Sequence, residues 1–123
     1  MSEYTLTVKG NPIPAARMTQ RSKWSKGARR SLDWQETVAY AWMEQTGNAT
    51  LKGPVVIEMK FYRKTRHITD IDNLIKGTMD GIQYAGGFEK GDHQVWKIQA
   101  EKHIDKENPR VEMVAKESIV DTS

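Results

Sequence analysis

The sequence predicts a single α+β domain over residues 1–123, in which two helices pack on a mixed sheet in the order β-α-β-α-β-β. A length of 123 residues with 37% apolar content suits one compact core. Four segments alternate apolar and polar residues, as half-buried strands do, and two others carry apolar stripes at helical spacing. Strands and helices that follow one another in this way are typical of helices packed on one sheet.

The first predicted strand covers residues 3–9, where Tyr4, Leu6 and Val8 share one face. The prolines of Gly10-Asn11-Pro12-Ile13-Pro14 end it, because they lack backbone donors. A polar loop over about 15–30 follows, and a loop of that length in so small a domain is usually functional or disordered. Within it, Trp24 either stacks on a base or pins the loop to the core.

The first predicted helix starts with Ser31 as its cap and runs to about Gln45, where Gly47-Asn48 stops it. Its apolar stripe is Trp34, Val38, Ala41 and Trp42. A second strand follows Pro54, with one apolar face formed by Val55, Ile57, Met59 and Phe61.

The second predicted helix runs from Thr69 or Asp70 to about Tyr84, and its buried stripe is Ile71, Leu74, Ile75, Met79 and Ile82. A third strand should then place four apolar residues on one face: Trp96, Ile98, Ala100 and Ile104. Val111, Met113 and Ala115 alternate in the last strand, and residues 116–123 are expected to be a frayed tail.

The composition excludes several classes of protein. Cysteine is absent, which rules out disulfides and zinc–thiolate sites and suits a reducing compartment. The first residues lack the features of a signal peptide, and no apolar run approaches the roughly 20 residues of a membrane span. We therefore expect a soluble, cytoplasmic protein with no membrane contact. No glycine-rich loop suited to cradling phosphates occurs, so no nucleotide cofactor is expected.

The positive charge is concentrated near the N-terminus. No acidic residue occurs from Tyr4 to Leu32, whereas Lys9, Arg17, Arg21, Lys23, Lys26, Arg29 and Arg30 all lie there. A second basic run is Arg63-Lys64-Thr65-Arg66-His67. Blocks of one sign indicate a polyanionic partner, although a solvated loop with scattered charge is the alternative.

The stretch Thr69-Asp70-Ile71-Asp72-Asn73-Leu74-Ile75-Lys76 allows two interpretations. In the structural one, Thr69 and Asp72 form a capping box and Asp72 pairs with Lys76 one turn later. In the functional one, Asp70 and Asp72 hold Mg²⁺ where strand meets helix, and Asp92 supplies a third carboxylate. Lys76 then neutralises charge in the transition state or orients water.

Three further polar residues are candidates to support such a site: Asn73, Asp80 and His93. His93 is adjacent to Asp92, so a supporting role or a merely exposed position are both open. His67 either touches phosphate or has no role, and His103 is assigned none.

With these motifs in view, the chain resembles the RusA family of Holliday-junction resolvases, which are common in phages and prophages. Three segments carry the resemblance: residues 10–17 (GNPIPAAR), residues 70–76 (DIDNLIK) with Asp80-Gly81-Ile82, and Gly91-Asp92-His93-Gln94-Val95. They occur in the family's order and cover nearly the whole chain. Gly91 stands where the family often has a first acid.

The resemblance implies a Mg²⁺-dependent homodimer, with Mn²⁺ as a substitute, that cuts four-way DNA junctions by paired symmetric nicks in recombination and repair. Asp70, Asp72 and Asp92 would be the essential metal-site carboxylates and Lys76 the essential lysine. A four-way junction has approximate twofold symmetry, so a C2 dimer supplies two cuts economically.

The basic segments would track the DNA arms, through Arg17, Arg21, Lys23, Lys26, Arg29, Arg30, Arg63, Lys64 and Arg66. Two alternatives remain: a nuclease for other branched DNA such as flaps and forks, or a non-catalytic phage DNA-binding module whose acids cap a helix.

Overall fold

The computed structural model describes residues 3–15, 26–66 and 68–118. The elements are β1 (Glu3–Lys9), α1 (Lys26–Thr46), β2 (Val55–Arg63), α2 (Ile71–Tyr84), the short 3-10 helix η1 (Asp92–Gln94), β3 (Val95–Ile104) and β4 (Arg110–Glu117). The predicted α+β class and the order β-α-β-α-β-β are confirmed. None of the described helices is long and apolar enough to cross a bilayer.

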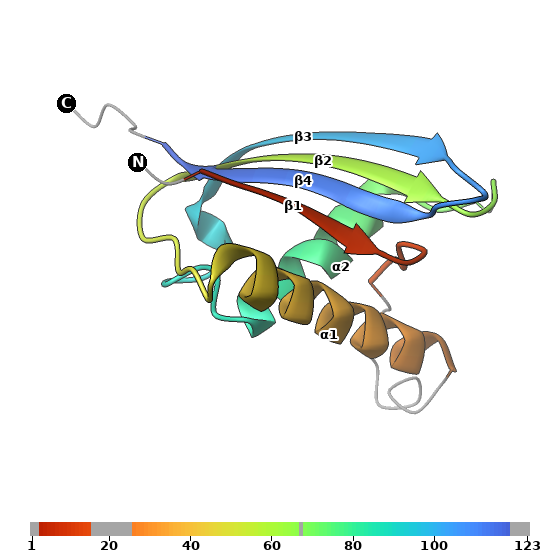
Figure 1. Ribbon diagram of the computed structural model, residues 1–123, viewed down its shortest axis with the longest axis horizontal. Coiled ribbons are helices and arrows are strands. Elements are labelled where there is room, and N and C mark those ends of the chain that lie inside the picture. The colour runs from red at the N-terminus through yellow and green to blue at the C-terminus, as the bar shows by residue number, and fades with distance from the viewer. Residues whose placement is uncertain (1–2, 16–25, 67, 119–123) are drawn as a thin grey trace.

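The four strands form one mixed sheet in the order β1-β4-β2-β3. β4 pairs antiparallel with β1 and β2, whereas β2 and β3 run parallel, as their connection through α2 requires. Both helices lie against the same face of this sheet (Figure 1). Inward residues of β1, β2 and β4 and the helix stripes form the core, which includes Trp42, Phe61, Leu74 and Met113.

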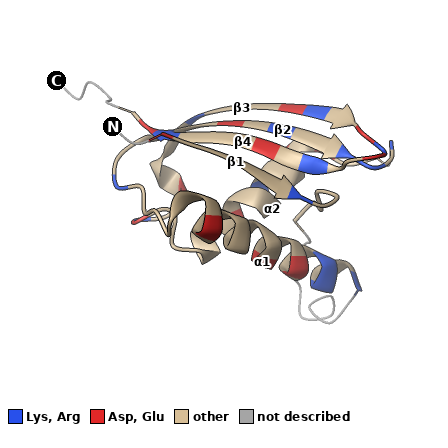
Figure 2. Ribbon diagram, in the orientation of Figure 1, with Lys and Arg blue, Asp and Glu red and all other residues tan. Residues whose placement is uncertain are grey.

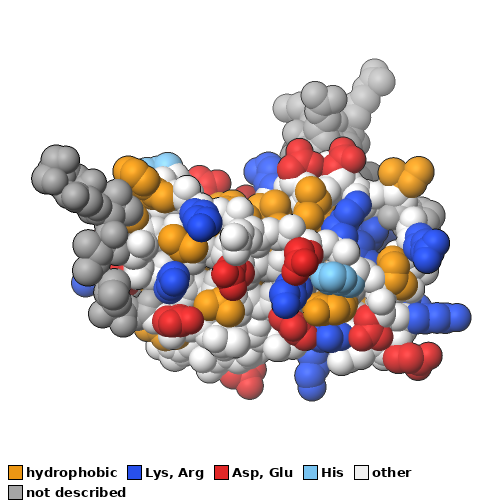
Figure 3. Space-filling view, turned by 90° about the horizontal axis from the view of Figure 1, so that it is seen from above, with side chains coloured by type: hydrophobic (Ala, Val, Ile, Leu, Met, Phe, Trp, Pro, Cys, Tyr) orange, Lys and Arg blue, Asp and Glu red, His pale blue; other side chains and the backbone are white. Residues whose placement is uncertain are grey.

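The other face of the sheet is open and polar. Seen from above, it mixes acidic, basic and apolar side chains instead of presenting one sign of charge (Figure 3). This pattern follows from the strand alternation, because Glu58, Lys60 and Glu112 occupy the outward phase of β2 and β4. A face of mixed charge offers no continuous track for a polyanion.

Helix α1 begins at Lys26, five residues before the predicted cap at Ser31. The expected cap was wrong, because Ser31 is buried inside the helix at 4% exposure. Ala28 and Ser31 extend the apolar stripe of Trp34 backwards with small residues, which favours helix over loop. Lys26, Arg29 and Arg30 therefore lie on the first turns of α1, and only the remainder of the expected 15–30 loop precedes it.

Close backbone approaches bring α2 against its neighbours. A Cβ on Gly81 would lie 2.6 Å from the Val38 Cβ of α1, so this crossing requires glycine. A Cβ on Gly77 would lie 3.0 Å from the Ile13 carbonyl oxygen. The Ala15 amide donates to the Asn73 carbonyl at 3.0 Å. Residues 11–15 are thereby docked on the N-terminal half of α2.

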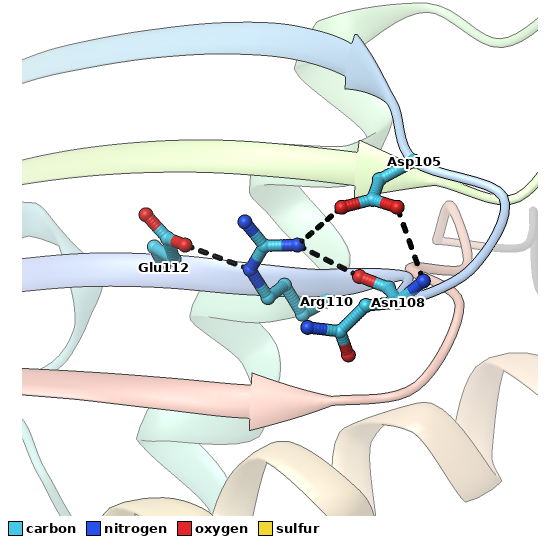
Figure 4. Close-up of polar contacts among 4 residues, drawn as sticks. All are labelled: Asp105, Asn108, Arg110 and Glu112. Atoms are coloured by element: carbon cyan, nitrogen blue, oxygen red, sulfur yellow. Dashed lines mark hydrogen bonds and ion pairs between the residues drawn. The ribbon is translucent and has the colours of Figure 1, made fainter.

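A polar cluster fixes the turn between β3 and β4 (Figure 4). Arg110 donates through Nη1 to Asp105 Oδ2 at 2.8 Å and through Nε to Glu112 Oε2 at 2.7 Å. The hydrogen bond from Arg110 lowers the pKa of the Asp105 carboxyl. The Asp105 amide donates to the Arg63 carbonyl at 2.9 Å, so the cluster also anchors the end of β2.

Strand β3 is an edge strand and is exposed along most of its length. The predicted single apolar face was only partly right. The pairing with β2 puts Ile98, Ala100 and Ile104 on the helix side, but a register shift leaves Trp96 without a paired residue on β2. Trp96 is 64% exposed, so β3 presents apolar side chains beside an unpaired backbone edge.

Candidate active site

Asp70 and Asp72 lie together where the chain enters α2. Asp70 is the N-cap residue, with extended backbone, and its carbonyl accepts from the Asn73 and Leu74 amides at 3.2 and 3.3 Å. Its side chain makes no capping hydrogen bond. Asp72 Oδ1 accepts from the amide of Asn73 at 3.0 Å, and both aspartates are exposed. The N-cap is Asp70 and not Thr69, whose hydroxyl accepts from Arg63 instead, so the Thr69–Asp72 capping box is not seen among the described residues. Neither carboxylate has an ion pair among these residues.

Thr69, the residue before Asp70, is anchored from two sides. Arg63 Nη1 donates to Thr69 Oγ1 at 2.8 Å, and Lys102 Nζ donates to the Thr69 carbonyl at 2.8 Å. Arg63 Nε also donates to the Pro12 carbonyl at 3.3 Å. These contacts join β2, β3 and residues 11–15 directly behind the acidic pair.

The sequence pattern predicted Arg63 as one of the cations that contact DNA, but its side chain is only 8% exposed. Burial lowers the pKa of its guanidinium. The guanidinium is committed to Pro12 and Thr69, so it acts as an internal brace. The signal was in the alternation: Arg63 follows Phe61 by two residues and shares the inward face of β2. Lys102 was missed altogether: it shares the phase of Ile98, Ala100 and Ile104, but its contact with Thr69 depends on the pairing of β3 with β2.

Lys76 lies one turn beyond Asp72 and is exposed. Its Nζ contacts Asp80 Oδ2 at 3.4 Å, instead of the Asp72 partner that the sequence allowed. A solvent-exposed pair of this kind contributes at most about 1 kcal/mol, so it holds the ammonium group only weakly. Asp72, Lys76 and Asp80 line one side of α2, and Asn73 is adjacent.

Asp92 lies at the opposite end of α2. It opens η1, whose residue Gln94 is fixed by hydrogen bonds to the Leu51 and Gly53 carbonyls at 2.9 and 3.0 Å. A Cβ on the preceding Gly91 would lie 4.0 Å from Gln83 Nε2, near the last turn of α2. The 14 residues of α2 span about 20 Å.

A single subunit thus brings together Asp70, Asp72 and Lys76 but not Asp92. Within the described residues, no group of three His, Asp or Glu side chains could hold a metal ion. His93 lies with Asp92 at the far end. Gly91 has a φ of 109°, a conformation that residues with a side chain rarely adopt, so glycine is favoured at this position.

Exposed cations gather at the end of the molecule where α2 begins. Lys26, Arg29 and Arg30 are exposed at the start of α1, and Lys64 and Arg66 are exposed after β2. Figure 2 shows these basic segments at the same end of the ribbon. Arg30 and Thr69 line one groove, which confirms that the start of α1 lies near the acidic pair. Arg17, Arg21, Lys23 and Trp24 lie outside the described residues.

Fold and site together define a small α+β domain with hard oxygen donors and a lysine beside cations, a set suited to phosphodiester chemistry. The model of the family Endodeoxyribonuclease RusA matches residues 9–115. This range includes Asp70, Asp72, Lys76 and Asp92. The chain belongs to this family, as the sequence motifs predicted. It is therefore an endodeoxyribonuclease that hydrolyses DNA phosphodiester bonds, of a family that resolves Holliday junctions in recombination. No individually curated protein matches the chain significantly.

Proposed function

We propose that this protein resolves four-way DNA junctions by paired symmetric nicks, with Mg²⁺ as cofactor and Mn²⁺ as a substitute. The observation that carries the proposal is the exposed Asp70 and Asp72 pair at the start of α2, with Lys76 one turn on. No ion pair in the described chain uses either carboxylate, so both are available to a hard cation. Mg²⁺ is commonly held by one or two carboxylates together with substrate phosphate, which fits this donor set.

The metal would supply charge stabilisation at the scissile phosphate. Asp70 and Asp72 would hold it, and the brace of Arg63 and Lys102 on Thr69 keeps the backbone at Asp70 fixed before substrate arrives. Lys76, which forms an exposed pair with Asp80, would turn its ammonium group toward the phosphate and stabilise the growing negative charge. Lys26, Arg29, Arg30, Lys64 and Arg66 would neutralise the neighbouring phosphates.

We infer that Asp92 joins this site from a second copy of the chain. Two observations support this. First, Asp92 and Asp70 are at opposite ends of α2, whose length is about 20 Å, so they are far apart within one chain. Second, the outer edge of β3 has no strand partner within the described residues, and exposed Trp96 and Ile104 lie beside it. Exposed apolar edge strands invite pairing with another chain.

Antiparallel pairing of β3 with the same strand of a second copy meets both observations. β3 begins directly after η1, which carries Asp92, and its other end carries Lys102, which contacts Thr69. Twofold antiparallel pairing sets the start of one β3 beside the end of the other. Asp92 of the partner subunit would then lie at the end of the molecule that carries Asp70. The same operation forms a second, identical site for the second nick.

Asp72→Asn with a synthetic four-way junction and Mg²⁺ tests the nuclease assignment. We expect the variant to bind the junction but to lose cutting by at least about a hundredfold. Wild-type cutting by the variant would refute the role of the acidic pair. Parallel assays on flap, fork and linear duplex decide the substrate, because a preference for flaps or forks would replace the junction assignment.

A mixing experiment tests the shared site. Asp70→Asn and Asp92→Asn are each expected to be inactive alone. In a mixed dimer, the wild-type Asp70 of one subunit meets the wild-type Asp92 of the other, so one intact site forms and the junction is nicked on one strand. If all three carboxylates belonged to one subunit, both sites of the mixed dimer would be defective and mixing would restore nothing.

A further inference from the structure

A groove opens directly beside the acidic pair. Its volume is about 410 Å³, and it lies between the start of α1, residues 11–15 and the loop that follows β2. Its walls include Ile13, Pro14, Arg30, Ile68 and Thr69. Because Thr69 precedes Asp70, anything that fills this groove lies next to the proposed cutting site.

The walls combine apolar and cationic chemistry. Ile68 is 97% exposed, the highest value for any large apolar residue described. In the sequence it lies between the cation Arg66 and the carboxylate Asp70. Ile13 and Pro14 add apolar surface, and Arg30 adds a positive charge at the rim. A flat apolar group linked to an anion matches this lining.

We propose that the groove takes one unstacked nucleotide of the strand that is cut, with its base against Ile13, Pro14 and Ile68 and its phosphate at Arg30. This proposal rests on the proposed function. A volume of this size is at the lower end of ligand sites, which span roughly 300–1,000 Å³, so it suits a single nucleotide and excludes a duplex.

The branch point of a junction is where such a nucleotide is easiest to obtain. Stacking is already interrupted there, so extruding a base costs less than in continuous duplex. Exposed isoleucines serve elsewhere as wedges that enter between base steps and hold them apart. Ile68 would gain burial by the same contact, which offsets its exposure in the free protein.

The groove is also preformed. Arg63, which also lines the groove, donates to the carbonyl of Pro12, next to the wall residue Ile13, and to the hydroxyl of the wall residue Thr69. One buried side chain thus ties the two walls together. Gly77 allows the lining residues 13–15 to pack closely on α2, which fixes the wall that they form. A rigid site of this kind loses little entropy when it is filled.

The test uses 2-aminopurine, whose fluorescence rises when it leaves the stack, placed beside the cutting point of a four-way junction. All proteins carry Asp72→Asn, so that the junction is bound without being cut. The parent should raise the fluorescence. Adding Ile68→Ala should remove at least half of that rise and weaken junction binding about tenfold, whereas Ile68→Met should retain both.

Two controls match these changes. Tyr40→Ala removes another exposed side chain, 68% exposed on α1 and outside the groove, and should alter neither readout. Arg30→Gln and Arg29→Gln each remove one exposed charge from the start of α1, but only Arg30 lines the groove. Both should weaken binding through the general charge effect, and only Arg30→Gln should reduce the fluorescence rise.

The outcomes separate this proposal from the one it rests on. If wild-type protein cuts the junction and Ile68→Ala leaves fluorescence and affinity unchanged, the groove proposal is overturned and the nuclease assignment stands. If the parent binds the junction without any fluorescence rise, the groove proposal is again overturned. If wild-type protein neither cuts nor binds the junction, both proposals fail.

Discussion

The replacement of Arg63 by methionine separates a buried brace from a DNA contact. Methionine keeps most of the apolar stem but removes the guanidinium, which donates to the Pro12 carbonyl and to Thr69 Oγ1. Hydrogen bonds from charged donors contribute about 1.5–3 kcal/mol each, so the gross loss is about 3–6 kcal/mol. Relief of the desolvated charge returns part of this.

If relief of the desolvated charge offsets about half of the gross loss, Arg63→Met lowers the free energy of unfolding by about 2 kcal/mol. For a chain of 123 residues this corresponds to a fall in melting temperature of about 6–12 °C. The matched control is Arg66→Met, which removes the same group from an exposed position three residues later. It should leave the melting temperature unchanged and instead weaken junction binding and reduce its salt dependence.

Thermal unfolding followed by circular dichroism measures the first effect, and a salt titration of junction binding measures the second. Equal melting temperatures for Arg63→Met and wild type would refute the brace. So would a pair of variants that weakened DNA binding to the same extent with no difference in stability, because that result would make Arg63 an ordinary phosphate contact.

Three further changes test other parts of the molecule. Gly81→Ala should destabilise the fold by about 1–3 kcal/mol, because the new methyl group would lie 2.6 Å from the Val38 Cβ, whereas Gly53→Ala enters open space and should be neutral in the same denaturation assay. Asp105→Asn should lower the melting temperature at pH 7. Arg110 lowers the pKa of Asp105 in the folded protein, so the carboxylate contributes to stability above its usual pKa of about 3.9 and loses that contribution as the pH falls through the folded pKa. Wild type and variant should therefore converge in acid. A gap that persisted in acid would contradict the ion pair. Lys76→Met should slow cutting without weakening junction binding, and an equal loss of both in a gel-shift and cleavage comparison would make Lys76 a binding residue only.

Local patterns in the sequence were sufficient for the order of the elements. Period-two alternation located β1, β2 and β4, and the stripes of α1 and α2 lie in the core as predicted. The start of α1 was missed because Ser31 is a good cap residue in isolation. Its burial depends on a close contact with the rest of the fold, which no local signal reports.

The role of Arg63 was accessible in principle, whereas that of Lys102 was not. Arg63 continues the inward phase of β2 beyond Phe61, so its burial follows from the same alternation that located the strand. Lys102 reaches the Thr69 carbonyl only because β3 pairs in parallel with β2 in one particular register. Register is a property of the assembled sheet, and a one-residue slip would turn Lys102 to the other face.

The position of Asp92 would link the proposed chemistry to assembly. The sequence predicts a site of three carboxylates, of which Asp70 and Asp72 lie at the start of α2 and Asp92 lies after its end. A straight helix of 14 residues keeps its ends about 20 Å apart. No side-chain rotation closes such a distance. A site that needs both ends of α2 is therefore incomplete in a monomer, and completing one site by a twofold operation completes the other. Cutting would then be confined to the state in which both nicks can be made, which limits the release of half-cut junctions without any separate signal between the sites.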